Sequence, residues 1–121
     1  MSNLPVVIKI GAVDYKVLLQ DKLEDDDYGY CDSHTQTIVI SKDQNAQSVG
    51  DTLLHEIMHA IWHESGLFAV KRPDEEQVVR TTSTWLCVVF RDNPAVLPFI
   101  QEPGPHWPHS ATPRGDQKHG S

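Results

Sequence analysis

The chain has 121 residues, of which 39% are hydrophobic and 22% charged, and its formal net charge is −7. This length and composition are typical of one globular domain with a modest core. The acidic charge argues against nucleic acid as a partner, because nucleic-acid-binding domains usually carry a basic face. No run approaches the 18 or so apolar residues of a membrane span, so we expect no membrane segment.

Targeting signals are also missing from the sequence. The N-terminus has no basic segment followed by a long apolar stretch, so we expect no signal peptide. The two cysteines, Cys31 and Cys87, form no CxxC pair and are too few for the disulfide framework of a small secreted domain. We therefore expect two reduced thiols in a cytoplasmic protein.

The first forty residues are rich in β-forming side chains. The runs PVVIKI (5–10) and DYKVLLQ (14–20) are separated by a short segment that includes Gly11, which predicts a hairpin. The runs YGYC (28–31) and QTIVI (36–40) flank the turn residues DSHT and predict a second hairpin. Together they predict a small antiparallel β-meander of three or four strands.

A helix is predicted to follow this sheet. The polar segment 41–51 leads into an apolar run that extends to about Ser65. Ser48 and Asp51 have the spacing of a capping box, which would start the helix at Ser48. A start near Asp43 is the alternative, since the glycine that follows is only a weak helix breaker.

A second helix is expected from about Pro73 to Arg91, and a short third one within 94–100. Two further segments are predicted to be irregular. The acidic connector 21–27 is interpreted as a solvated loop, and 101–121, rich in Pro, Gly and polar residues, as a flexible C-terminal tail. The predicted fold is α+β, with residues 1–100 as one domain.

The predicted first long helix contains the sequence HEIMH (55–59). At about 100° per residue, its polar side chains fall within one narrow stripe, whereas the other positions are apolar almost all round. This pattern predicts a central, largely buried helix with one polar seam. The seam consists of Thr52, His55, Glu56, His59 and His63.

Such a seam suits a metal ion. Imidazoles at positions i and i+4 lie one above the other, so His55 and His59 can both reach one zinc ion at about 2.0–2.1 Å. Glu56 is turned by about 100° from His55, which lets it miss the metal and meet a water bound to it. The spacing therefore predicts a zinc site with Glu56 as the base that activates a water.

A catalytic zinc usually has a third protein ligand. His63 lies about 12 Å along the helix from His55, which is too far, and the metzincin pattern would need histidine where this chain has Ser65. The acidic start of the second helix is the better source. Glu75 and Glu76 each lie on a helix face that is predicted to point inward, so spacing alone does not choose between them as the third ligand.

The segments of the chain follow in this order: a short predicted β-sheet, then TLLHEIMHAIW, then EEQVVRTTSTWLCVVFRDNP. In this order of its segments the chain resembles small HExxH proteins of tailed phages and prophages. More broadly it is similar to the minimal zincin domain of ImmA/IrrE-like and SprT-like metallopeptidases. The resemblance covers roughly residues 5–97 and is strongest in HEIMHA. It implies zinc on His55 and His59, with Glu56 as catalytic base.

In the ImmA/IrrE-like pattern a glutamate that opens the next helix is the third ligand, and Glu76 matches that position best. The SprT-like pattern needs a third histidine well downstream, and none lies between His63 and His106. This chain also lacks a helix-turn-helix domain, so a repressor-cleaving role is not carried over. If phage-encoded, the protein would work in the cytoplasm of a bacterial host.

Two functions from different classes follow. The first is a zinc-dependent metallopeptidase that acts on a protein or peptide. The second is a phage accessory or structural protein that keeps a zincin-like zinc site with little turnover. Candidate oxyanion stabilisers are Tyr28, Tyr30, His34 and His63. If strand 36–40 lies at the sheet edge, a substrate peptide can add to it as a further strand.

Overall fold

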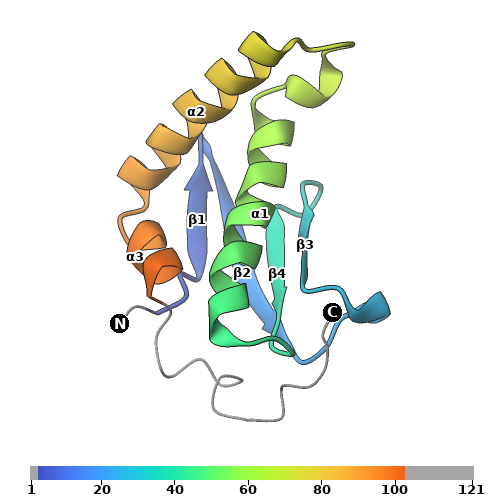
Figure 1. Ribbon diagram of the computed structural model, residues 1–121, viewed down its shortest axis with the longest axis vertical. Coiled ribbons are helices and arrows are strands. Elements are labelled where there is room, and N and C mark those ends of the chain that lie inside the picture. Colours follow the sequence, from blue (N-terminus) through green and yellow to red (C-terminus); the bar gives the residue numbers. More distant parts are fainter. Residues whose placement is uncertain (1–2, 103–121) are drawn as a thin grey trace.

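The computed structural model describes residues 3–102, which form an α+β fold with one four-stranded sheet and helices on one side of it (Figure 1). The strands are β1 (Val7–Ile10), β2 (Val13–Gln20), β3 (Gly29–Asp32) and β4 (Thr37–Ser41). The helices are α1 (Ala46–Glu64), α2 (Glu75–Asp92) and α3 (Val96–Gln101), with short 3-10 turns η1 (Glu24–Asp26) and η2 (Leu67–Ala69). Most of the predicted tail, 103–121, lies outside the described residues.

Both predicted hairpins are confirmed. β1 and β2 pair antiparallel through a turn in which Gly11 has a φ of 66°, a conformation that glycine adopts without steric cost. A Cβ at Gly11 would also come within 2.6 Å of the Trp85 ring. In the turn between β3 and β4, Asp32 accepts hydrogen bonds from the backbone N–H groups of His34 and Thr35 at 2.9 and 3.4 Å.

The predicted meander is wrong in its strand order. The order is β1-β2-β4-β3, and β2 pairs with β4 in parallel, so the sheet is mixed. The acidic connector, which includes η1, carries the chain past the place that β4 later fills. β3 therefore takes the outer edge. Strand 36–40, which a peptide could extend only if it lay at the edge, is an inner strand that is paired on both sides.

Helix α1 packs across one face of the sheet, as the apolar pattern predicts (Figure 1). Its start is the earlier of the two predicted alternatives, because Asn45 is the N-cap. The Asn45 side chain accepts the backbone N–H of Ser48 at 2.9 Å, so Ser48 lies inside the helix and the expected Ser48 cap is wrong. The sheet and α1 contribute most of the apolar core: Ile8, Ile10, Tyr15, Val17, Ile38, Ile40, Val49, Leu53, Ile57, Ala60 and Ile61. Val89 of α2 and Val96 and Phe99 of α3 complete it.

Helix α2 lies beside α1 on the side of β1, and its first half packs loosely. Asp74 is its N-cap and accepts the backbone N–H of Gln77 at 2.8 Å. Val79, on the face expected to point inward, is 55% exposed. Only one residue of α2, Val89 in its last two turns, is buried. Among residues 3–102 no helix is long and apolar enough to cross a membrane.

Candidate metal centre

The polar stripe of α1 faces away from the core toward β3. His55 and His59 are exposed, and their Nε2 atoms are 3.1 Å apart with the rings edge to face. Two imidazole nitrogens at this distance share either a proton or a cation, since two lone pairs repel each other. The helix is held from behind by buried Leu53, Ile57 and Ile61, so the two rings project from a fixed backbone.

The separation of these nitrogens suits zinc. Two nitrogens bound tetrahedrally at 2.0–2.1 Å lie about 3.3 Å apart. The 3.1 Å in this structure is within a few tenths of an ångström of that value. His55 and His59 can therefore bind one metal ion with little movement, as their spacing predicted.

Glu56 occupies the position between the two histidines and is turned toward the protein. Its side chain is only 4% exposed, and among residues 3–102 no group donates a hydrogen bond to its carboxylate. Burial raises the pKa of this carboxyl, the positive charge of His55 lowers it, and the negative charge of Asp27 raises it further. A buried carboxyl without donors is rare in proteins, and a catalytic role or a bound water or ion is a common reason for one.

The opposite wall of the site is the edge strand β3 and the residue before it. Together with α1 they enclose an open hollow of about 380 Å³, which we call the histidine cleft. Gly29 permits the close approach of strand and helix: a Cβ there would come within 2.7 Å of Thr52 Cγ2 and 2.8 Å of the Val39 carbonyl oxygen. The cleft is lined by Asp27, Gly29, Tyr30, Cys31, Ser33, His55, Glu56, His59 and His63.

A buried hydrogen-bond network fixes the helix to the start of this strand. Thr52 Oγ1 donates to Gln44 Oε1 at 2.9 Å. Gln44 Nε2 in turn donates to the backbone carbonyls of Tyr28 at 3.0 Å and Ser41 at 2.8 Å. The sequence placed Thr52 in the seam but gave no sign that it ties α1 to the loop that carries Asp27.

Cys31 lines the histidine cleft, which the sequence did not suggest. Burial, followed by the charges of Glu56 and Asp32, raises the pKa of its thiol to about 12. Cys31 is therefore a neutral thiol at ordinary pH. The signal that could have found it is alternation: in β3, residues 29 and 31 share a face, and Gly29 lies directly against α1.

The other predicted residues divide between the cleft and the surface. Tyr30 and His63 line the histidine cleft, and the His63 ring stacks on Phe68 with centroids 4.7 Å apart. Tyr28 lines an adjoining hollow. His34 lies in the exposed β3–β4 turn and lines neither hollow.

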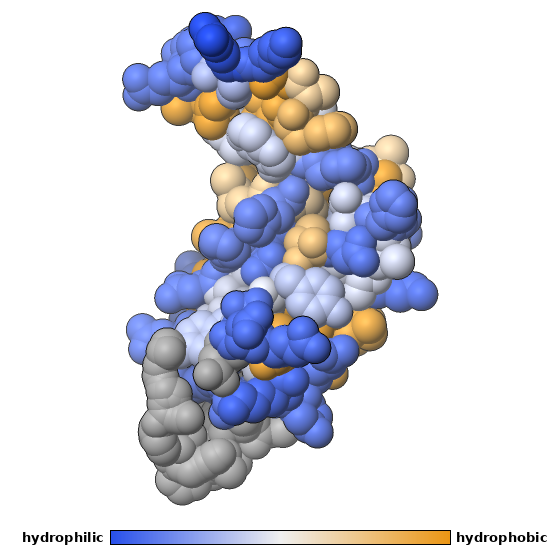
Figure 2. Space-filling view, turned by 90° about the vertical axis from the view of Figure 1, so that its right-hand side faces the viewer, coloured by the Kyte–Doolittle hydropathy of each residue, from blue (hydrophilic) through white to orange (hydrophobic). Residues whose placement is uncertain are grey.

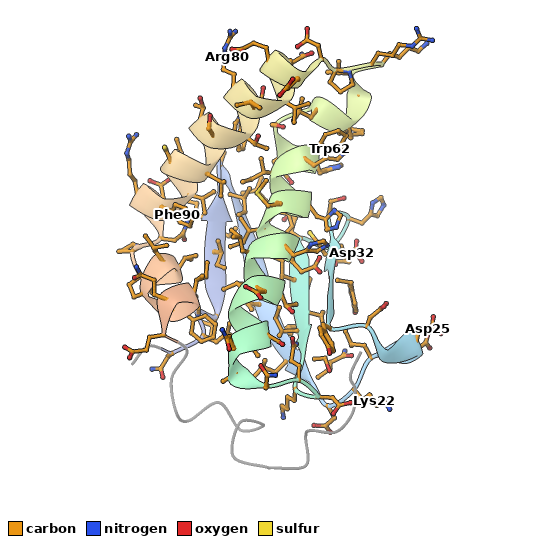
Figure 3. All side chains as sticks on the ribbon, in the orientation of Figure 1. Lys22, Asp25, Asp32, Trp62, Arg80 and Phe90 are labelled. Atoms are coloured by element: carbon orange, nitrogen blue, oxygen red, sulfur yellow. The ribbon has the colours of Figure 1, made fainter. Side chains whose placement is uncertain are left out.

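Glu75 and Glu76 are not brought to the histidines. Both are exposed, and Glu76 forms an ion pair with Arg80 at 2.9 Å, in which both side chains are 72% exposed. Arg80 lies near the top of α2, well away from Asp32 in β3 (Figure 3). Among the side chains that the structure describes, no group of three or more His, Cys, Asp or Glu is arranged to hold a metal ion. The predicted set of His55, His59 and Glu76 is thus only partly assembled, and a ligand role for Glu76 stays a prediction.

The surface around the cleft differs from the top of the molecule. Figure 2 shows that the face with β3 is mainly hydrophilic, whereas apolar surface gathers toward the top. The exposed apolar side chains include Phe68 and Val70 at and after η2, and Val79 in α2.

Comparison of the chain with protein-family models, curated proteins and solved structures finds no significant match. What the site does has therefore to be inferred from its own geometry.

Proposed function

We propose that this protein is a zinc-dependent metallopeptidase in which Glu56 is the catalytic base. The observation that carries the proposal is the pair of Nε2 atoms of His55 and His59, 3.1 Å apart, beside a buried carboxylate that lacks a donor. An ordinary structural zinc would be closed by four protein ligands and would have no use for this carboxylate.

The donor set is chemically suited to zinc, since neutral imidazole is one of its preferred ligands. His55 and His59 would hold the ion; Glu76, the third ligand that the resemblance implies, is exposed and paired with Arg80 on α2, and it would join them only if the first turn of α2 moved to the cleft. When bound, such an ion acidifies a water and polarises a carbonyl group of the substrate. Because the histidines are exposed to the cleft, the ion would be open to both water and substrate.

The role of Glu56 would be to move a proton. Its carboxylate lines the cleft next to the histidines, in a buried position that makes it a stronger base than a solvated glutamate. It would take a proton from the attacking water and deliver it to the nitrogen of the departing amine. That transfer completes hydrolysis of a peptide bond.

The sheet offers a place for the substrate backbone. At the β1 edge, the Asn93 side chain accepts from Lys9 N at 2.8 Å and donates to Lys9 O at 2.9 Å, so the backbone groups of Lys9 already have partners. The β3 edge has a strand partner only on its inner side, and Gly29, Tyr30 and Cys31 line the cleft. An extended peptide would therefore add to β3, not to strand 36–40 as the sequence suggested.

Hydrolysis of an unstructured protein such as casein, before and after removal of metal, tests the proposal. We expect cleavage by the zinc-loaded full-length chain, loss of cleavage after treatment with a chelator, and recovery when zinc is added back. Cleavage that survives complete chelation would refute the metal-dependent mechanism. A zinc-loaded, folded protein that cuts neither casein nor a broad peptide mixture would favour the accessory protein with a retained zinc site.

A further inference from the structure

A second hollow of about 360 Å³ adjoins the histidine cleft. The two share Asp27, Gly29, His55 and Glu56, so an extended ligand can reach from one into the other. The second hollow is walled by the residues before and at the start of β3 on one side and by the first half of α1 on the other. We call it the acidic subsite, after Asp27 and Asp51, which lie on its opposite walls.

Acidic groups outnumber basic ones in this subsite, which is lined by Asp27, Asp51 and Glu56 and by a single imidazole, that of His55. Asp27 and Asp51 are exposed, and within residues 3–102 neither carboxylate has a hydrogen-bond donor or an ion-pair partner. No lysine or arginine is among the described residues that line either hollow. A cationic ligand would be attracted by the carboxylates of Asp27 and Asp51, and an anionic ligand would be repelled by them.

Glu56 gives an independent sign that this place receives a ligand. It is more than nine-tenths buried, lacks a donor among the described residues, and lines both hollows. Three carboxylates thus face one continuous space, two at its rim and one at its base. The net charge of −7 for the whole chain would also draw cations toward the surface.

The position of Asp51 sets the distance to the reacting bond. Asp51 lies one turn before His55 on α1, which is about 6 Å along the helix axis. An extended peptide advances about 3.3–3.6 Å per residue, so Asp51 lies about two residues from the metal-binding histidine. A side chain or chain end that reaches Asp51 belongs to a residue close to the bond that is cut.

From this geometry we infer that the acidic subsite binds a cationic nitrogen group of a peptide, either a lysine or arginine side chain or a free amino terminus. The assignment to a peptide rests on the proposed metallopeptidase function. The cation preference rests on the carboxylates of Asp27 and Asp51, which line the subsite without a cationic partner among the described residues. The enzyme would accordingly prefer peptides with a positive charge within a few residues of the cleaved bond.

Binding of short fluorescent peptides to full-length Glu56→Gln protein in the presence of zinc chloride tests this inference. The peptides share one sequence and carry lysine, glutamine or glutamate at one position, with the amino terminus acetylated. A fourth peptide without lysine or arginine has a free amino terminus. The variants are Asp27→Asn/Asp51→Asn and, as a control with the same charge change, Asp14→Asn/Asp92→Asn, whose exposed carboxylates line neither hollow.

We expect the lysine peptide, the peptide with a free amino terminus, or both to bind roughly 3- to 10-fold more tightly than the acetylated glutamine peptide. The comparison of these two peptides identifies the source of the cation. The preference should vanish in Asp27→Asn/Asp51→Asn, persist in the control variant and weaken as salt is raised. Equal binding of all four peptides, no binding of any, or a preference unchanged in Asp27→Asn/Asp51→Asn would overturn the inference.

Hydrolysis by the wild-type chain separates this inference from the proposed function. A cation preference in binding without any hydrolysis would support the subsite and contradict the peptidase. Hydrolysis of the lysine, glutamine and glutamate peptides and of the free-amino-terminus peptide at equal rates would contradict the subsite and support the peptidase.

Discussion

Two glutamates that the sequence singles out lie in opposite surroundings. Glu56, in the middle of α1, is 4% exposed and has no donor among the described residues. Glu76, in the first turn of α2, is 72% exposed and is bonded to Arg80. Burial of the Glu56 carboxylate without a donor costs folding free energy, as is typical of a catalytic group. The solvated ion pair of Glu76 contributes little to the free energy of folding.

The difference reflects what packs on each helix. α1 has the sheet behind it and the edge strand β3 beside its polar seam, so both the core face and the polar seam have neighbours. The first half of α2 has few neighbours, and its apolar Val79 is exposed with Glu76. An acidic helix start is therefore not by itself a metal ligand, because the position of the helix decides what its side chains reach.

The strongest test of this contrast is the rate of hydrolysis. Glu56→Gln removes the proton acceptor at nearly constant shape, so kcat should fall by roughly 10²–10⁴-fold. Glu76→Gln should leave kcat within about twofold of wild type if Glu76 stays where the structure has it. Equal losses in the two variants would show that metal binding brings the first turn of α2 to the cleft, as the resemblance implies.

The two cysteines probe the same two regions. Cys31 lines the cleft with a pKa raised to about 12, whereas Cys87 is exposed on α2. Only the thiolate reacts with iodoacetamide, and very little of Cys31 is thiolate at neutral pH. In the metal-free native protein, Cys87 should therefore be modified at least about tenfold faster than Cys31. Mass spectrometry of timed samples gives both rates. Faster labelling of Cys31 would contradict its described environment.

The stability of the metal-free protein should depend on Glu56 in a definite direction. Its folded pKa is raised above the ordinary value of 4.5, so the full stability is present below about pH 4.5 and part of it is lost as the pH rises through the folded pKa. Urea unfolding from pH 4 to 7 should therefore show Glu56→Gln becoming more stable relative to wild type as the pH rises. A constant difference across this range would argue against a buried, donor-free carboxylate.

The smallest effect is expected at the ion pair of α2. Glu76→Gln should lower the free energy of unfolding by no more than about 0.3–0.5 kcal/mol, since exposed i,i+4 pairs contribute little. Added salt should reduce even this difference. Arg80→Gln is the matched variant and should match Glu76→Gln within error. A loss several times larger would mean that the first half of α2 packs more tightly than described.

Local patterns predicted much of this molecule, because they are set by nearby residues. Alternation and turn residues found both hairpins, and helical periodicity found the seam on α1. The parallel pairing of β2 with β4 was missed, because nothing in a strand of five residues records which neighbour it will have. Cys31 and Asp27 were missed for the same reason: their place in the cleft depends on how β3 docks against α1, through Gly29 and the Gln44 network.

The central claim is that His55 and His59 bind a metal ion, and the metal content of the purified full-length chain tests it most directly. His59→Ala removes one of the two facing nitrogens, and His34→Ala removes an exposed imidazole that lines neither hollow. We predict about one zinc per chain, as expected for a single site, in wild type and in His34→Ala, with a loss of most of it in His59→Ala. A zinc-free wild type under zinc-replete conditions, or equal zinc in all three proteins, would contradict the account.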